Sequence, residues 1–450
     1  MSKRYMKISP TNSGEGVFGF SKGNNQLIFH ISNTGLLQTH ELRLQGKLQI
    51  IDTTTGLPIT DRTTDVNLDA FAGVSAFVQT LDIASTKYST RSLEQIREYP
   101  RLANLIHSHL YDKANLDTQL FHETGAKGRG VDTPVEETYN EGDTAFWFSD
   151  ANQTQAQRRP YCLAGGKDFD IRLVSGLFMS TPEIDLDALG GLTITLTCSP
   201  DSQVLHTDGT TTYQYQILNP RIVAPVIMPD AQMEATMAQS GTYELDFLSF
   251  TSLYNTLVST QQQTVHKTAL NGVVSVMNSY VPTSFINNFA ENGLAQYNPG
   301  IRKVIFSRNG MRFPLEYDLT PELNPNVPQD QQPTTYPQLL WNGIEAVRNV
   351  NGVNSLEKTS FNPLICASEQ QETKSGLFST GVCYDVVSGA GIDASMDTLS
   401  FEVQASLIAP GDFDSNPATN PPSVSYSVYT YYLAKNSVMV DKGQGVMVEK

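Results

Sequence analysis

Cysteine and tryptophan are scarce in this chain, whose 450 residues include four Cys and two Trp. The cysteines are scattered and form no CxxC pair, so we expect reduced thiols in a protein made in the cytosol. Long apolar stretches are missing too: there is no run of about 18 apolar residues, and no transmembrane helix is predicted. The first residues, Met1 to Lys7, are basic but lack the apolar stretch of a signal peptide, so we expect no secretion.

Charge is sparse and unbalanced. Only 17% of the residues are charged, and 46 Asp and Glu against 30 Lys and Arg give a formal net charge of −16. A phosphate backbone repels such a chain, which argues against a general nucleic-acid-binding protein. Thr, Ser, Asn and Gln are abundant instead, and we expect a large surface of uncharged polar strands and loops.

Sharp catalytic motifs are also absent. The sequence has no GxSxG elbow, no HExxH helix and no Cys-His signature, and nothing marks a carboxylate pair of the kind a glycosidase needs. Residues Gly14 to Gly19 match GxGxxG, but phosphate binding requires a preceding strand and, for dinucleotides, a following helix, and neither is predicted there. We therefore interpret this motif as part of a flexible tail.

Three histidines could suggest a metal site. His107 and His109 are two residues apart on a predicted helix and point to nearly opposite sides, so they cannot chelate one ion together. With His122 further along the chain, they are interpreted as ordinary polar residues.

Three carboxylates form the other metal candidate. Glu183, Asp185 and Asp187 alternate with apolar residues, which on a strand places them on one face, where they could bind Ca²⁺ at a subunit junction. A solvated strand face or a charge-guarded sheet edge is the preferred interpretation. No catalytic, cofactor-binding or metal-binding residue is therefore assigned, and no cofactor or enzymatic activity is predicted.

What the chain does contain is one pattern used twice. Residues 192–198 alternate apolar and polar, and a polar loop and an aromatic strand within 213–228 follow. Roughly 210 residues later the same order recurs at 399–407 and within 424–440. Alternation with period two indicates strands with one buried face. The recurrence predicts an all-β unit that is present twice.

The predicted organisation follows from this repeat. The expected parts are a flexible N-terminal arm at 1–23, a first β unit at 24–230 with a long helix-containing loop at about 90–166, and a second unit at 241–450 with a loop and short helix at about 320–376. Residues 91–111 have helical apolar spacing, and Pro100 predicts a kink or two short helices. Loops this long are usually functional or pack against a neighbour.

Three stretches carry a family resemblance. They are Leu42-Arg43-Leu44-Gln45-Gly46 running through 66–83 into Leu93–Leu102, then Pro282-Thr283-Ser284-Phe285-Ile286-Asn287-Asn288, and then Val304–Gly310 leading into Arg312–Tyr317. In this order, and with the two-unit layout, they resemble the double jelly-roll major capsid proteins of tailless icosahedral double-stranded DNA viruses, most closely those of virophages and polinton-like viruses. The resemblance covers most of the chain.

The resemblance implies two eight-stranded jelly-roll sandwiches in tandem, with short helices in the loops. It implies a homotrimer that forms a pseudohexagonal capsomer of the virion shell, made in the host cytoplasm. The implied partners are neighbouring capsomers, penton proteins and minor capsid or cement proteins. Contact of the basic arm, with Lys3, Arg4 and Lys7, with DNA, membrane or a minor protein is a further hypothesis.

A carbohydrate-binding β-sandwich or a fibre protein is the alternative hypothesis, because it too would have strands rich in Thr and Tyr. A lectin site usually exposes aromatic side chains, and the two tryptophans, Trp147 and Trp341, fall in or beside the predicted loops.

Overall fold

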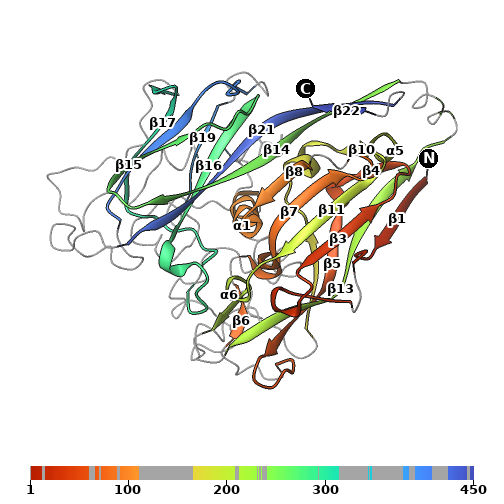
Figure 1. Cartoon of the computed structure of the whole chain (residues 1–450), viewed down its shortest axis with the longest axis horizontal. Coiled ribbons are helices and arrows are strands. Elements are labelled where there is room, and N and C mark those ends of the chain that lie inside the picture. Colours follow the sequence, from red (N-terminus) through yellow and green to blue (C-terminus); the bar gives the residue numbers. More distant parts are fainter. Residues whose placement is uncertain are drawn as a thin grey trace, which may run out of the picture.

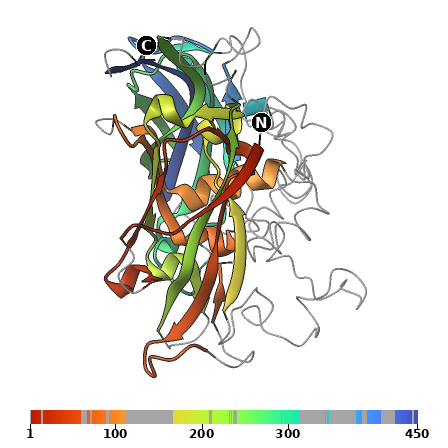
Figure 2. The same ribbon diagram turned by 90° about the vertical axis from the view of Figure 1, so that its right-hand side faces the viewer.

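In the computed structural model the chain forms two β-sandwiches that lie against each other, the first at the right and the second at the upper left of Figure 1. Both termini lie toward the same end of the molecule (Figure 2). The structure describes residues 2–12, 16–59, 66–69, 72–88, 92–110, 166–207, 212–230, 232, 235, 241–291, 293–313, 343, 345–346, 379–384, 391–407, 424–442 and 446–449.

The first sandwich has a seven-stranded and a four-stranded sheet, both antiparallel. The larger sheet has the order β10-β4-β13-β5-β9, and β1 and β2 also pair with β13. Its strands are β1 (Ser2–Ile8), β2 (Val17–Phe18), β4 (Leu36–Gln38), β5 (Arg43–Asp52), β9 (Lys167–Arg172), β10 (Glu183–Asp185) and β13 (Tyr213–Met228). The smaller sheet, in the order β3-β11-β7-β8, contains β3 (Gln26–Ile31), β7 (Val78–Ser85), β8 (Ser92–Arg97) and β11 (Leu192–Cys198).

The second sandwich has a five-stranded and a four-stranded sheet. The larger has the order β14-β21-β16-β19, with β22 also on β21, and the smaller has the order β15-β20-β17-β18. The strands are β14 (Thr242–Leu257), β15 (Gln261–His266), β16 (Val273–Pro282), β17 (Ile301–Arg308), β18 (Met311–Arg312), β19 (Ser379–Cys383), β20 (Leu399–Ala405), β21 (Tyr426–Asp441) and β22 (Val446–Glu449). A separate two-stranded sheet pairs β6 (Val66–Leu68) with β12 (Leu205–Thr207).

The helices are short and lie between strands. They are α1 (Tyr99–Leu110), α4 (Gly176–Ser180), α5 (Leu186–Leu189) and α6 (Asp201–Val204), with the 3-10 turns η1 (Phe20–Lys22), η2 (Thr39–Glu41), η3 (Gly73–Phe77) and η6 (Thr283–Phe285). Within the described ranges, none is long and apolar enough to cross a membrane.

The pattern repeated in the sequence corresponds to strands in equivalent places. β11 and β20 are each the second strand of a four-stranded sheet, and β13 and β21 are each a 16-residue strand inside the larger sheet. In β11 every second residue, from Leu192 to Cys198, is buried, and the threonines between them are half-buried. The predicted all-β class, with two sandwiches in tandem and short helices in the connections, is confirmed.

β16 and β21 are buried on both faces, unlike the outer strands. All ten residues of β16 are buried, as are Tyr426–Ala434 of β21. The hydroxyl of Tyr432 lies 2.9 Å from Nδ1 of His266 inside the second sandwich. The hydroxyl of Tyr431 instead donates to the carbonyl of Glu98 in the first sandwich, at 2.9 Å. The sheet that contains β21 is therefore covered on one face by the smaller sheet of its own sandwich and on the other face by the first sandwich.

The structure corrects the expected flexible arm. Ser2–Ile8 form β1, which pairs with residues 222–228 of β13, and Lys3 forms an ion pair with Glu41 at 2.6 Å. Met6 and Ile8 pack against the core. These two apolar side chains lie on one face of the strand and pack it against the larger sheet. In the sequence this short apolar pattern is difficult to recognise because basic residues surround it.

The helix expected across 91–111 is also only half correct. Residues 92–97 form β8 at the edge of the smaller sheet, and α1 begins at Tyr99, directly after Glu98 with its φ of 52°. Pro100 lies in the first turn of α1, where its missing N–H has no helical partner to lose. The proline therefore marks the start of one helix rather than a kink.

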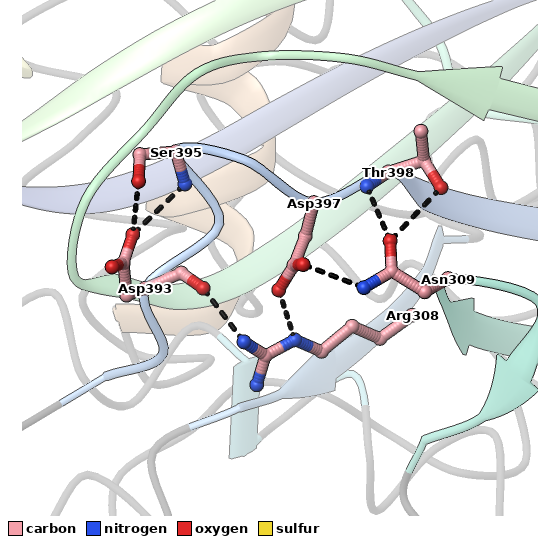
Figure 3. A network of polar contacts seen from close by, with 6 residues as sticks. All are labelled: Arg308, Asn309, Asp393, Ser395, Asp397 and Thr398. Carbon is pink, nitrogen blue, oxygen red and sulfur yellow. Dashed lines mark hydrogen bonds and ion pairs between the residues drawn. The ribbon is translucent and has the colours of Figure 1, made fainter.

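The hairpin that joins β17 to β18 is held by a polar network (Figure 3). Asn309 and Gly310 have φ values of 52° and 77°, as a two-residue type I′ turn requires. The side chain of Arg308 donates to the carboxylate of Asp397 and, at 2.8 Å, to the carbonyl of Asp393. The amide of Asn309 also donates to Asp397, at 2.5 Å. The turn is thereby tied to the segment that precedes β20.

We predict a pH-dependent effect of Asp397→Asn on stability. Hydrogen bonds from Asn309 and Arg308 hold the pKa of Asp397 below its usual value. A pKa that is lower in the folded chain means that the stabilisation is complete above the unfolded pKa of about 4 and is lost as the pH falls through the folded value. Thermal unfolding followed by circular dichroism should show a lower midpoint for the variant at pH 7 and a shrinking difference toward pH 3.

The matched control is Asp246→Asn, which alters an exposed carboxylate on β14 that forms no ion pair with a described residue. It should unfold like the wild type at both pH values. An Asp397→Asn deficit that is the same at pH 7 and pH 3 would contradict the assigned role of the network.

Candidate functional site

Buried polar side chains hold the contact between the two sandwiches, called the seam below. The first sandwich contributes β8, α1 and α4, and the second contributes β14 and β21. Figure 1 shows α1 between the two sandwiches, beside β14 and β21. The seam determines how one sandwich is oriented on the other.

Glu94 of β8 is the centre of the seam. The residue is 3% exposed, and its carboxylate accepts hydrogen bonds from the hydroxyl of Ser175, from the N–H of Gly176 at 3.0 Å and from the N–H of Leu177 at 3.2 Å. A fourth donor is the N–H of Phe250 in β14, at 2.7 Å. One carboxylate thus joins β8, the first turn of α4 and a strand of the other sandwich.

The protonation of Glu94 is governed by two opposing effects. Burial raises the pKa of Glu94, and the hydrogen bonds from Ser175, Phe250, Leu177 and Gly176 act in the opposite direction. A buried carboxyl group is tolerated only where such donors surround it. The geometry therefore requires α4 and β14 to be in place together.

Close approach of the backbones supports the same contact. A Cβ on Gly176 would lie 2.6 Å from the carbonyl oxygen of Leu248, so only glycine lets α4 approach β14 this closely. At the other end of α4, the hydroxyl of Ser180 accepts the N–H of Leu248 at 2.8 Å. The outer edge of β14 is therefore hydrogen-bonded by groups of the first sandwich.

Helix α1 forms the second half of the seam. The guanidinium of Arg101, which is 1% exposed, lies 4.2 Å from the centre of the Tyr429 ring on β21. Asn104, one turn later, donates to the carbonyl of Leu294 at 3.1 Å. Stacking over an aromatic ring suits a buried cation, because the ring face is electron-rich. Arg101 and Asn104 thus fix α1 to the second sandwich.

The GxGxxG match does not form a phosphate loop in its described part. Gly14 and Glu15 lie outside the described residues, whereas Val17 and Phe18 form β2, which pairs with β13. A Cβ on Gly19 would lie 2.8 Å from the carbonyl oxygen of Tyr215, so this glycine permits close contact with β13. The expectation of a flexible tail is wrong for this end of the motif.

The three carboxylates at 183–187 do not share a strand face. β10 ends at Asp185, whose side chain caps α5 by accepting the N–H groups of Asp187 at 3.0 Å and Ala188 at 3.1 Å. Lys442 of the second sandwich lies 3.4 Å from the same carboxylate. Among the residues that the structure describes, no group of three or more His, Cys, Asp and Glu could hold a metal ion.

The histidine candidates are only partly visible. His107 and His109 both lie on α1, as their spacing predicted, and His107 is half-buried. His122 lies outside the described residues. Among the candidates that the structure describes, none are therefore brought together into a metal site.

Comparison with solved structures extends over nearly the whole chain. The capsid protein in a quasi-atomic model of the PBCV-1 virus capsid matches with a TM-score of 0.58 at 11% identity, covering 99% of this chain and 97% of that chain. The Faustovirus major capsid protein matches with a TM-score of 0.57 at 9% identity, covering 98% and 90%. The mavirus major capsid protein matches with a TM-score of 0.52 at 10% identity, covering 99% and 90%.

The chain has the double jelly-roll fold. No family model matches the sequence, and no curated protein is similar to it in sequence. At these identities the likeness to solved structures establishes the shared fold. Both jelly rolls and the seam between them lie within the matched length.

Glu94 and Arg101, which fix the two jelly rolls to each other, were not identified from the sequence. Both are charged residues inside apolar surroundings, between Leu93 and Ile96 and next to Leu102. Charged residues are rarely buried without partners, so a charge within such a segment is the available signal. It indicates that partners exist but not which ones, because these come from distant parts of the chain.

We predict that Glu94→Gln destabilises the whole chain. The amide has one acceptor oxygen in place of two and adds an N–H group that faces other donors. Each buried N–H left without an acceptor costs about 1–3 kcal/mol, so the free energy of unfolding should fall by about 2–4 kcal/mol, measured by urea denaturation.

The control is Glu183→Gln, which alters an exposed carboxylate of the same jelly roll and should change stability by less than about 0.5 kcal/mol. Equal stability of Glu94→Gln and Glu183→Gln would show that the seam does not depend on the Glu94 carboxylate.

Proposed function

We propose that this chain is the major capsid protein of a tailless icosahedral double-stranded DNA virus and acts as a structural subunit of the virion shell. The observation that carries the proposal is the double jelly-roll match, which spans 98–99% of this chain and 90–97% of capsid proteins with the same fold. The matched length includes both jelly rolls. A single sandwich of common type would match only half of such a protein.

The proposed mechanism is geometric. Three copies of a chain with two jelly rolls give six jelly rolls around a threefold axis, and this pseudohexagonal capsomer can tile a shell. Such tiling needs subunits whose two halves keep one orientation. The seam supplies this, since Glu94 and Arg101 both bind across it from buried positions.

The proposed partners are the other copies in the trimer, neighbouring capsomers, penton proteins and minor capsid or cement proteins. The basic N-terminal residues remain candidates for contact with DNA, membrane or a minor protein, but not all of them are equally available for such a contact. Lys3 is already paired with Glu41, whereas Arg4 and Lys7 are exposed on β1.

No specific observation favours the alternative of a carbohydrate-binding or fibre protein. The two tryptophans that would support it, Trp147 and Trp341, lie outside the described residues. We propose no enzymatic activity.

We predict that the purified chain forms trimers. Multi-angle light scattering should give three times the 49.5 kDa of one chain, and negative-stain images should show particles with hexagonal outlines. A monomer that binds glycans on an array would refute the capsid proposal and favour the alternative.

A further inference from the structure

Arg101 is a buried cation whose charge no side chain of the described residues neutralises by direct contact. The residue is 1% exposed, and its guanidinium lies over the ring of Tyr429. Its Nε and Nη1 atoms are both buried and donate no hydrogen bond, and the side chain forms no ion pair with a described residue. Stacking on a ring face does not satisfy the N–H groups at the rim of the guanidinium. A charge taken out of water in this way needs a further partner.

The two carboxylates closest to Arg101 along the chain are already engaged. Glu94 is bound by the four donors of the seam. Glu98 accepts a hydrogen bond from Nε2 of Gln79 at 2.6 Å. Because each carboxylate has its own donors and neither forms an ion pair with Arg101, the partner of Arg101 has to come from elsewhere.

A second donor without an acceptor lies beside the same ring. Ser279 of β16 is 0% exposed, and its hydroxyl forms no hydrogen bond within the described chain. It pairs with Tyr429 across the strands, and residues directly opposite each other project from the same face of a sheet. Ser279 therefore lies on the face of the larger sheet that α1 covers (Figure 1), next to the ring on which Arg101 stacks.

Gln296 brings an amide to the same contact. It is 0% exposed, and neither its amide nitrogen nor its amide oxygen forms a hydrogen bond with a described residue. Two residues earlier, the carbonyl of Leu294 accepts a hydrogen bond from Asn104 of α1 at 3.1 Å. One residue later, the N–H of Tyr297 donates to the carbonyl of Tyr280 in β16 at 2.8 Å. The backbone thus holds Gln296 between α1 and β16.

We propose that Arg101, Ser279 and Gln296 bind a small inorganic anion of the chloride class inside the seam. Almost every buried polar group in a folded protein has a partner, so three orphaned groups in one contact point to a bound species. The guanidinium, the hydroxyl and the amide all supply donors. A water molecule can accept their hydrogen bonds but leaves the charge of Arg101 uncompensated, whereas a monovalent anion does both.

The proposed anion would join the two jelly rolls. Arg101 belongs to the first jelly roll, and Ser279 and Gln296 belong to the second. An ion that binds only the folded chain stabilises it by mass action. For one site, the equilibrium constant of unfolding falls about tenfold for each tenfold rise in ion concentration above the dissociation constant. This anion site does not depend on the capsid function, since it concerns only the contact within one chain.

The test measures urea denaturation of the full chain over about a hundredfold range of chloride. Sodium gluconate replaces sodium chloride so that the ionic strength stays constant. Arg101→Met removes the donors and the charge, and Arg97→Met makes the same change at an exposed residue of β8. We expect the wild type and Arg97→Met to show the same chloride dependence, about tenfold per tenfold, and Arg101→Met to show none. Chloride-independent wild type, or an unchanged chloride dependence in Arg101→Met, would overturn the proposal.

A second measurement needs no variant and applies even if Arg101→Met does not fold. Crystals of the wild-type chain grown in sodium bromide are measured at the bromine absorption edge. We expect an anomalous peak within hydrogen-bonding distance of Nε or Nη1 of Arg101. Water alone at these nitrogens, or bromide found only on the surface of the protein, would refute the anion site.

Discussion

The orientation of the two jelly rolls depends on one buried carboxylate. Glu94 accepts hydrogen bonds from Ser175 and the start of α4 and from Phe250 of the other jelly roll. A carboxylate taken out of water is very unfavourable unless all of its donors are present. Partial or shifted docking of the jelly rolls would leave Glu94 without the N–H of Phe250, so this contact penalises every alternative orientation more strongly than an apolar contact of the same size.

A rigid seam turns two domains into one building block. Buried apolar side chains pack the larger sheet of the second jelly roll against the first jelly roll. Apolar burial is non-directional, however, and sheets can slide on one another with little change in buried area. The hydrogen bonds of Glu94, Ser180 and Asn104 have directions, and all three engage backbone groups of the partner jelly roll. Burial therefore supplies most of the attraction, and the polar contacts determine the angle that tiling requires.

The sequence predicts well what depends on neighbours along the chain. The alternation in β11 and β20 identified the repeat, and Asn309-Gly310 forms the hairpin turn that such a pair favours. Prediction from the sequence fails where an element is determined by contacts with residues far away along the chain. The segment of β8 predicts a helix because Leu93 and Ile96 have helical spacing, but they lie on opposite faces of a strand that its pairing with β7 fixes. The donors to Glu94 lie 82 and 156 residues away in Gly176 and Phe250, so no local pattern could reveal them.

The repeat itself is visible only on one side of its strands. The core-facing residues of β13 and β21 are mostly apolar or aromatic, because each strand packs inside its own sandwich. On the opposite face β21 has Tyr429 and Tyr431, which contact the first jelly roll. β13 instead has Gln216 and Arg221, which donate hydrogen bonds to Gln49 and Gln45 of the neighbouring strand β5. The same strand position thus carries aromatic residues where a neighbour is built into the chain and polar ones where it is not.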